Sequence, residues 1–326
     1  MAYKSTILIT GGTSGLGYYA ALDIARACPD SQVIISSRTD KEQAAAAINK
    51  TLGQSNVAYV PLDLGDLAKV RNYVEAFAAA QHPPIKALVL NAGLQFPGEV
   101  KTTTDGLEAT FGINHVGHAL LFHLLVPYLA DGARVLVTSS GTHDPEQAIG
   151  TPLPIYTTAE ALAHPTPDFS ASHSGRQRYT TSKLCNVLWT YALARRLAEK
   201  VPERGITVTA MDPGLVPGTG LGREAAAVAR FLFMKVLPHT IPLLRFLMGT
   251  PNVHPPSVSG AALARLAVGD DEGVRGVTAK YFEGRREIPS SKDSYDAEKQ
   301  EGLWRWTVGF LSGGDEEVRR RFEEFR

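Results

Sequence analysis

The stretch Thr6-Ile-Leu-Ile-Thr10-Gly-Gly-Thr-Ser-Gly-Leu-Gly17 decides the fold of this 326-residue chain. Its first five residues are mostly apolar and β-branched, as expected of a strand buried on both faces. A glycine-rich turn follows and leads into Gly17–Ala27, whose apolar periodicity predicts a helix. A strand that runs through a tight glycine turn into a helix is typical of the first unit of a parallel α/β sheet.

The same alternation of strand-like and helix-like segments continues along the chain. The expected strands are Thr6–Thr10, Gln32–Ser37, Asn56–Pro61, Ala87–Asn91, Arg134–Ser139 and Thr207–Met211. The expected helices are Gly17–Ala27, Asp40–Leu52, Leu67–Ala80, Asp105–Leu129 and Tyr179–Lys200. This order predicts an α/β fold with a Rossmann-type, doubly wound parallel sheet, and we expect residues 1–326 to form a single domain.

Composition limits the partners and the compartment. Lys and Arg number 33 and so do Asp and Glu, so the neutral chain has no global field to attract nucleic acid. Its two cysteines, Cys28 and Cys185, are too few for a disulfide framework and lack zinc-site spacing. The sequence shows no signal peptide and no uninterrupted apolar run near the roughly 20 residues of a spanning helix. We therefore expect a cytoplasmic protein without a nucleic-acid partner or a transmembrane segment.

The glycine turn has the features of a phosphate-binding loop. Gly11 permits a tight turn, Gly15 lets the backbone approach a pyrophosphate, and Gly17 lets the helix pack against the strand. The helix N-terminus adds free N–H groups and partial positive charge. A glycine turn without a ligand is the alternative, but its place between the first strand and the first helix favours a dinucleotide site. The expected contacts are Gly11, Thr13, Ser14, Gly15, Leu16 and Gly17.

Residues at the ends of the next strands favour one dinucleotide. Arg38 follows the second strand, where an acidic residue would suit NAD; a guanidinium matches a 2′-phosphate, although a surface arginine is common there. We therefore predict NADP(H) as the cofactor. Asp63, beside Leu64, either accepts from the adenine amino group or caps the helix that starts near Asp66. Asn91-Ala92-Gly93 is expected to shape the floor under the adenine-side ribose.

The chemistry is expected from Tyr179-Thr-Thr-Ser-Lys183 on a helix. Positions i and i+4 share a face, so a phenol lies beside an ammonium. A nearby cation lowers the pKa of a tyrosine from about 10 and makes proton exchange with a carbonyl oxygen easier. Ser140, after the fifth strand, would hydrogen-bond the substrate oxygen, or else belong to an ordinary serine-rich loop. Asn114 is an unfavourable residue inside a helix, which predicts either a kink with a bound water or a satisfied buried amide.

Two other chemistries are less consistent with the sequence. His115, His118 and His123 have helical spacing, but histidines on an apolar helix are more often packed than metal-bound, so we expect no metal. Ser140 with a histidine and Asp144 suggests a hydrolase triad. No Gly-x-Ser-x-Gly elbow surrounds Ser140, which argues against that reading.

As an ordered set, these motifs resemble the short-chain dehydrogenase/reductase superfamily from Thr6 to about Phe282. The resemblance implies a catalytic tetrad of Asn114, Ser140, Tyr179 and Lys183, with Lys183 also holding the nicotinamide ribose. It further implies nicotinamide-side contacts from Pro213, Gly214, Val216 and Thr219.

The chain is most similar to the retinol dehydrogenase and protochlorophyllide reductase branch. Leu215 stands where the light-driven reductases carry a cysteine, which indicates an ordinary dark reductase. Relatives often form homodimers through the helices that bear Asn114 and Tyr179, although long insertions can block that surface.

Two irregular regions are expected to border the substrate. Gly141–Gly175 and about 214–250 each follow the carboxyl end of an expected strand, where open α/β sheets bind ligands. We expect 1–140 to be mainly the dinucleotide-binding half and 141–326 the catalytic and substrate half, with a lid over 214–250. The lid's apolar residues either cover a lipophilic pocket or simply pack the domain, and they also suit shallow membrane contact. The apolar residues are Phe231, Leu232, Phe233, Met234, Leu237, Leu243, Leu244, Phe246 and Leu247.

The sequence therefore predicts an NADPH-dependent reductase or dehydrogenase for a lipophilic or aromatic ketone or aldehyde. A catalytically silent NADP(H)-sensing protein would be expected to have a damaged tetrad, and here all four side chains are present. An epimerase or dehydratase of nucleotide sugars shares Tyr-x-x-x-Lys but needs a more polar region after Gly214.

Overall fold

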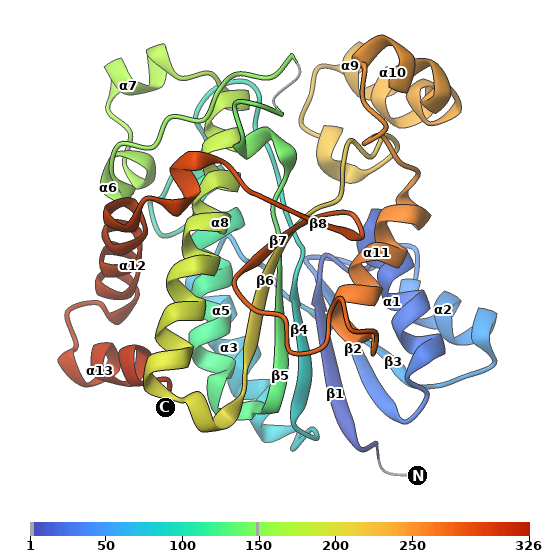
Figure 1. The fold of residues 1–326 in the computed structure, drawn as a ribbon, viewed down its shortest axis with the longest axis vertical. Helices are drawn as coiled ribbons and strands as arrows, with labels where there is room; N and C mark the ends of the chain where they lie inside the picture. Colours follow the sequence, from blue (N-terminus) through green and yellow to red (C-terminus); the bar gives the residue numbers. More distant parts are fainter. Residues whose placement is uncertain (1–2, 148–149) are drawn as a thin grey trace.

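The computed structural model describes residues 3–147 and 150–326, and these form one eight-stranded sheet (Figure 1). The strand order is β3-β2-β1-β4-β5-β6-β7-β8, and all neighbours are parallel except β7 and β8. The strands are β1 Ser5–Thr10, β2 Ser31–Ser37, β3 Val57–Pro61, β4 Ile85–Leu90, β5 Leu129–Thr138, β6 Thr207–Asp212, β7 Lys280–Glu283 and β8 Arg286–Ile288. The predicted doubly wound parallel sheet is therefore confirmed.

The central strands explain their own sequence. Ile7, Leu8 and Ile9 of β1 have no exposed surface, because β2 and β4 flank the strand and helices cover both faces. A strand buried on both faces needs apolar side chains at every position, which is why the sequence shows no alternation there. The chain reverses direction across the sheet between β1 and β4, so a crevice opens at the carboxyl ends of these two strands.

Helices form a layer on each face of the sheet (Figure 1). In one layer α1 contacts α11; in the other α3 contacts α5 and α8 contacts α12. The first layer contains α1 Gly15–Ala27, α2 Ala44–Leu52 and α11 Pro256–Val268. The second contains α3 Leu67–Ala79, α5 Gly117–Leu125, α8 Gly175–Lys200 and α12 Ala297–Ser312.

The long helix expected over Asp105–Leu129 is interrupted at Asn114. A short α4, Ala109–Phe111, passes into a π-helical turn, Gly112–Val116, before α5 begins. A π turn inserts one extra residue into a helix and is common at functional sites. The α-helical pattern is therefore interrupted at Asn114 by a π turn, and the expected kink with a bound water stays a prediction.

Both irregular regions contain short helices. The 141–175 region holds α6, Ala159–Ala163, and α7, Pro167–Ser172, while its residues 148–149 lie outside the described part. The lid consists of α9, Ala227–Phe231, a π turn, Leu232–Val236, and α10, Ile241–Met248. In Figure 1 these two regions stand above the sheet on opposite sides of its carboxyl edge.

The C-terminal segment carries charges of both signs on its surface and packs on the core through two aromatic residues. The helix α13, Glu316–Glu324, does form, and its arginines and glutamates pair on the surface. However, Phe322 and Phe325 are buried against the α5 side of the core. These two aromatic residues therefore attach α13 to the core.

Two segments are apolar and long enough to cross a membrane by length and composition. One is Ala109–Tyr128, whose apolar window is 89% buried inside the described structure, as expected of a core helix. The other is the lid pair Ala227–His239 and Ile241–Met248, which is bent by 102°. The expectation that no segment spans a membrane remains a prediction.

Candidate active site

A cavity of about 870 Å³ lies at the carboxyl edge of the sheet, where β1, β4, β5 and β6 end. Ser140, Tyr179 and Lys183 line it, whereas Asn114 does not. The predicted cofactor contacts all line it as well: Gly11, Thr13, Ser14, Gly15, Leu16, Gly17, Arg38, Asp63, Leu64, Asn91, Ala92, Gly93, Tyr179, Lys183, Pro213, Gly214, Val216 and Thr219. The structure thus brings residues from both halves of the sequence to one cavity.

The glycine turn has the close approaches that a phosphate-binding turn requires. Gly11 and Gly15 adopt φ values of +69° and +57°, which favour glycine. A Cβ on Gly17 would overlap the Gly11 carbonyl oxygen, so the start of α1 can lie against β1 only with glycine there. The N-terminus of α1 therefore faces the cavity with no side chain covering it.

The end of the cavity beyond the glycine turn is lined by three cations, Arg38, Lys41 and Arg223, and by two carboxylates, Asp40 and Glu42. Arg38 makes no ion pair among the described residues, and Thr13 and Ser37 join their hydroxyls beside it at 2.9 Å. Arg223 from the lid also lines the cavity. Burial is the main cause that lowers the pKa of Arg223, and repulsion from the nearby Arg38 lowers it further. Sequence reasoning missed Arg223, because only the fold brings the lid over the end of β2.

Asp63 does not cap the following helix. Its Oδ1 accepts from the Gly65 amide at 3.1 Å, while Asp66 caps α3 by accepting from the Lys69 amide at 3.1 Å. The capping alternative is therefore wrong for Asp63, whose side chain lines the cavity.

Asn91 ties the ends of the central strands together. Its Nδ2 donates to the Thr10 carbonyl at 2.9 Å, and its own amide donates to the Thr10 hydroxyl at 2.9 Å. The Thr138 hydroxyl of β5 reaches its Oδ1 at 3.5 Å. The amide thus holds β1, β4 and β5 in register at the cavity floor.

Tyr179 and Ser140 meet across the cavity from α8 and from the end of β5. Burial raises the pKa of the Tyr179 phenol well above its usual value, and Asp212 raises it further, while hydrogen bonding to Ser140 lowers it. The predicted lowering of this pKa by Lys183 is not seen. The phenol is removed from water here, and this loss of hydration is the largest cause of the rise in its pKa.

Lys183 lies one turn after Tyr179, with its Nζ 5.6 Å from the centre of the phenol ring. It is 3% exposed and donates to the Thr138 carbonyl at 2.9 Å. Burial lowers its pKa to about 8, with Asp212 acting in the opposite direction. The buried Lys183 amine, held between a strand end and a phenol, can therefore exchange a proton at a pH close to neutral.

Asn114 lies behind the cavity wall. Its Oδ1 accepts from the Leu94 amide at 2.8 Å, and its Nδ2 donates to the Leu94 carbonyl at 2.9 Å and to the Ser182 hydroxyl at 3.0 Å. The amide is thus satisfied, which confirms one of the two expectations, while the bound water of the other stays a prediction; Asn114 lies in the π turn Gly112–Val116. Through these bonds Asn114 braces the segment after β4 against α8.

Asp212, which sequence reasoning did not select, is a buried carboxylate at the end of β6. It is 1% exposed, lines the cavity, and accepts from the Gly214 amide at 2.9 Å and from Asn252 Nδ2 at 2.7 Å. Its charge raises the pKa values of both Tyr179 and Lys183. The available signal was its position directly before Pro213-Gly214, at a strand end.

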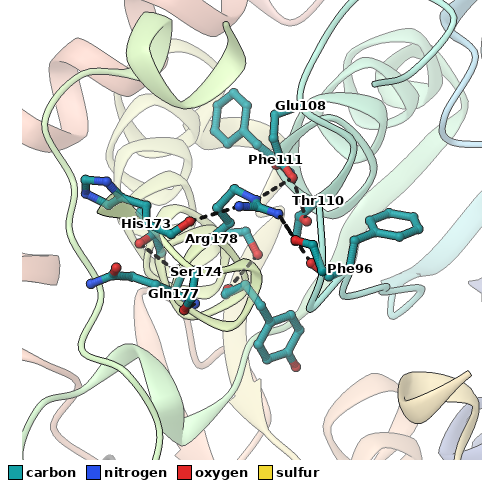
Figure 2. Close-up of polar contacts among 12 residues, drawn as sticks. Phe96, Glu108, Thr110, Phe111, His173, Ser174, Gln177 and Arg178 are labelled. Atoms are coloured by element: carbon teal, nitrogen blue, oxygen red, sulfur yellow. Dashed lines mark hydrogen bonds and ion pairs between the residues drawn. The ribbon is translucent and has the colours of Figure 1, made fainter. Parts of the chain in front are cut away.

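The residue before the tyrosine anchors the helix start, as Figure 2 shows. Arg178 Nε contacts Glu108 Oε1 at 3.2 Å, and these two side chains are only 6% and 2% exposed. The guanidinium also donates to the carbonyls of His173 and Gly98, both at 2.9 Å. Glu108 in turn accepts from the Phe111 amide at 2.8 Å. This network fixes α8 to α4 and to the loop after β4, one residue from the phenol.

The histidines of the α4–α5 region are packing residues. His115 Nε2 contacts the Thr307 hydroxyl and His118 Nε2 the Thr10 hydroxyl, each at 2.9 Å, and His123 stacks on Phe322. Burial lowers their pKa values to about 3, 4 and 3, so all three are neutral at ordinary pH.

The hydrolase alternative lacks its central contact. His143 Nδ1 approaches the Ser140 carbonyl at 2.7 Å, and its Nε2 accepts from the Ser291 amide at 3.1 Å. Nδ1 also lies 3.4 Å from the Tyr281 hydroxyl, and neither ring nitrogen bonds the Ser140 hydroxyl.

Comparisons with known proteins agree with this geometry. The model of the short chain dehydrogenase family matches residues 5–159. Zebrafish (Danio rerio) polyprenol dehydrogenase is 31% identical over 316 residues, covering 93% of this chain and 86% of its own. Pea (Pisum sativum) protochlorophyllide reductase is 33% identical over 248 residues, covering 71% and 60%. These matches confirm the resemblance that the motifs carried, including its branch.

A solved structure extends the likeness to the fold. The angucycline C-6 ketoreductase LanV with bound NADP superposes with a TM-score of 0.60 at 20% identity, covering 86% of this chain and 94% of that one. The glycine turn, the phenol–amine pair and the relatives agree: this chain belongs to the short chain dehydrogenase family, oxidoreductases that interconvert CH–OH and C=O groups.

Proposed function

We propose that this protein is an NADP(H)-dependent reductase that interconverts a ketone or aldehyde with an alcohol on a lipophilic or aromatic small molecule. The observation that carries the proposal is the convergence of Ser140, Tyr179 and Lys183 on the cavity that the glycine turn also lines. Bound NADPH supplies the hydride that adds to the carbonyl carbon.

The chain's own residues handle the proton. The Ser140 hydroxyl positions the substrate oxygen, and the Tyr179 phenol donates its proton to that oxygen as negative charge develops on it. The raised pKa keeps the phenol protonated and ready to donate. Lys183 stands one turn behind with a pKa of about 8, suited to return a proton towards the phenol. Asn114 is a positioning residue, since it acts only through Leu94 and Ser182.

The cofactor's phosphates would lie at two places. The pyrophosphate would face the N-terminus of α1, where Gly17 leaves the backbone uncovered. A 2′-phosphate would lie at the charged end of the cavity between Arg38 and Arg223. Neither Arg38 nor Arg223 forms an ion pair among the described residues, and the nearby Glu224 is itself paired with Lys101, so two guanidinium groups are available to a phosphorylated ribose.

The substrate class is inferred from the cavity walls. Leu94, Leu215, Leu221, Phe233 and Met248 line it beyond the catalytic side chains, which suits an apolar body next to one polar carbonyl. A polyprenol dehydrogenase and a protochlorophyllide reductase are named among the relatives, and both names refer to large lipophilic molecules.

The alternatives each conflict with a specific feature. A silent NADP(H) sensor has no need of a lysine buried one turn after a buried tyrosine. A nucleotide-sugar epimerase or dehydratase needs polar groups where Phe233 and Met248 face the cavity. Hydride transfer from NADPH to added ketones separates the proposal from both.

The function is tested by an NADPH-oxidation assay across lipophilic ketones and aldehydes. We expect Tyr179→Phe to lower kcat/KM by about 10²–10⁴-fold and to leave the Kd for NADPH nearly unchanged, because only the transferable proton is removed. Tyr191→Phe is the matched control, since this tyrosine lies on the same helix and does not line the cavity. Full activity in Tyr179→Phe would overturn the proposal.

The cofactor preference is tested by titration calorimetry with NADPH and NADH. We expect Arg38→Ala to weaken NADPH binding by about 10- to 100-fold and to leave NADH binding within about twofold, because one charge-assisted contact to the phosphate is lost. Arg26→Ala is the control, as Arg26 pairs with Asp23 on α1 outside the cavity. An unchanged ratio of the two affinities, or tighter binding of NADH by the parent protein, contradicts the assignment.

A further inference from the structure

The outer face of the lid is the most apolar exposed surface in the described structure. Its large apolar side chains are open to solvent on both arms of the bent helix pair, and Phe246 is 82% exposed. Of the three uses expected for the lid's apolar residues, covering the pocket and packing the domain do not apply to this exposed set, which leaves shallow membrane contact. The exposed set is Val228, Phe231, Leu232, Val236, Leu243, Phe246 and Leu247, which we call the lid face.

The charged residues that accompany the lid face on the same helices are all positive. No aspartate or glutamate occurs between Glu224 and Asp270, although the whole chain is neutral. Arg230, Lys235 and Arg245 are exposed on the same helices and form no ion pair among the described residues. A neutral chain that gathers cations and large apolar groups on one hairpin has the composition of an interfacial anchor.

The inner face of the same hairpin lines the cavity. Ala229 and Phe233, from the first arm, and Met248, from the second, border the space that Tyr179 also borders. The lid therefore separates the exposed apolar face from the catalytic phenol by the thickness of one helix layer. A molecule leaving an apolar phase at the lid face would meet an apolar wall before it met the catalytic groups.

We propose that the lid face lies on the surface of an anionic lipid bilayer, with its apolar side chains in the headgroup–acyl boundary and its cations among the headgroups. The bent pair would lie in the interface and not span it, because the two arms turn by 102° at the break. The second part of the inference, that the substrate enters the cavity from the lipid, rests on the proposed function.

A second copy of the chain fits this surface less well. A two-fold symmetric contact places the same patch on both partners. Arg230, Lys235 and Arg245 would then face their own counterparts with no carboxylate nearby to offset them. Anionic headgroups supply the opposite charge and also accept the apolar side chains.

The experiment is co-sedimentation of the full chain with vesicles of phosphatidylcholine alone and of phosphatidylcholine mixed with phosphatidylglycerol in equal parts. We expect binding to the mixed vesicles that weakens with added salt. Phe246→Glu with Leu247→Glu should lower the partition coefficient at least about tenfold, because two apolar groups and the favourable charge are lost together. Neither residue lines the cavity, so kcat/KM for a small, water-soluble ketone should not change.

The matched control adds the same two charges elsewhere. Ala79→Glu with Ala80→Glu places them on exposed positions at the end of α3 and should leave vesicle binding unchanged. Equal loss of binding in both double variants overturns the proposal, since the effect would then follow net charge alone. Failure of the parent chain to bind mixed vesicles also overturns it.

Light scattering in solution supplies the remaining test. A dimer that Phe246→Glu with Leu247→Glu disrupts, together with absent vesicle binding, assigns the lid face to a second copy and overturns the proposal. Vesicle binding is measured without substrate or cofactor. Its failure is therefore distinguishable from failure of the reductase assay.

Discussion

The cavity is bordered by two regions of opposite character. The start of α8 is held by a buried ion pair between Arg178 and Glu108 and by backbone carbonyls around the guanidinium (Figure 2). The lid stands across the carboxyl edge of the sheet (Figure 1). It exposes Phe246 and Leu247, and its cations form no ion pair among the described residues. The wall at the start of α8 is fixed by a buried ion pair, whereas the lid exposes apolar side chains to water.

The difference corresponds to what each wall must do. Tyr179 and Ser140 must keep a fixed distance, so the helix that carries the phenol is fastened one residue away. The lid must let a large substrate in and out. No residue of its helices α9 and α10 is buried, so few buried contacts hold them in place. Rigidity and access are thus separated onto different segments of one cavity.

The largest effect should come from breaking the anchor. We expect Arg178→Met to lower the free energy of unfolding by about 3–5 kcal/mol, because it leaves Glu108 buried without its cation. Chemical denaturation measures the change.

The control for that prediction removes both charges. Arg178→Met combined with Glu108→Leu should recover part of the lost stability, since no unpaired buried charge remains. A double variant as unstable as the sum of the two single ones would mean that the ion pair is not coupled.

A smaller effect on the same wall should depend on pH. Burial lowers the pKa of Lys183 from 10.5 to about 8 in the folded protein, so the unfolded chain binds this proton more strongly between these values. The contribution of Lys183 to the free energy of unfolding therefore rises as the pH increases from about 8 to 10.5, by up to about 3 kcal/mol.

This contribution is isolated by comparing the parent protein with Lys183→Met in denaturation curves across that range. The variant should be the more stable of the two at pH values below 8, and the gap should narrow as the pH rises. A gap that stays constant with pH contradicts the shift. Lys200→Met, at the exposed end of the same helix, is the control.

The smallest effect should come from the lid. Phe246→Ala and Leu247→Ala should each change the free energy of unfolding by no more than about 0.5 kcal/mol, since both side chains are largely exposed. Phe122→Ala, fully buried on α5, should cost about 3–5 kcal/mol in the same assay. A large loss in the lid variants would show that the lid packs the domain and would remove the contrast between the two walls.

Much of the fold was predictable because its signals are local. The apolar runs of β1 and β2 and the glycine turn between β1 and α1 each depend on neighbours within a few residues. The strands β7 and β8 were missed, since each is only a few residues long and has mixed polarity. Strand β5 was expected to start at Arg134 but begins at Leu129, which pairs with Ile85 of β4. The exposed residues between Leu129 and Arg134 do not have the apolar pattern of a buried strand.

The site followed the same division. The spacing of Tyr179 and Lys183 is set by the helix period, so the sequence alone placed them on one face. The predicted direction of the Tyr179 pKa shift was wrong. The shift depends on burial and on the charge of Asp212, which lies at the end of β6, far from Tyr179 in the sequence. Arg178 was overlooked because its partner Glu108 lies 70 residues away.

By itself, then, the sequence determined the parallel sheet, the phosphate-binding turn and the phenol–amine pair, since period and turn chemistry act over a few residues. Only the tertiary structure decided which charges are buried, which lid residues face the cavity and which face outward. Burial is a property of the packed layers, and it assigns opposite environments to side chains as similar in sequence as Phe233 and Phe246.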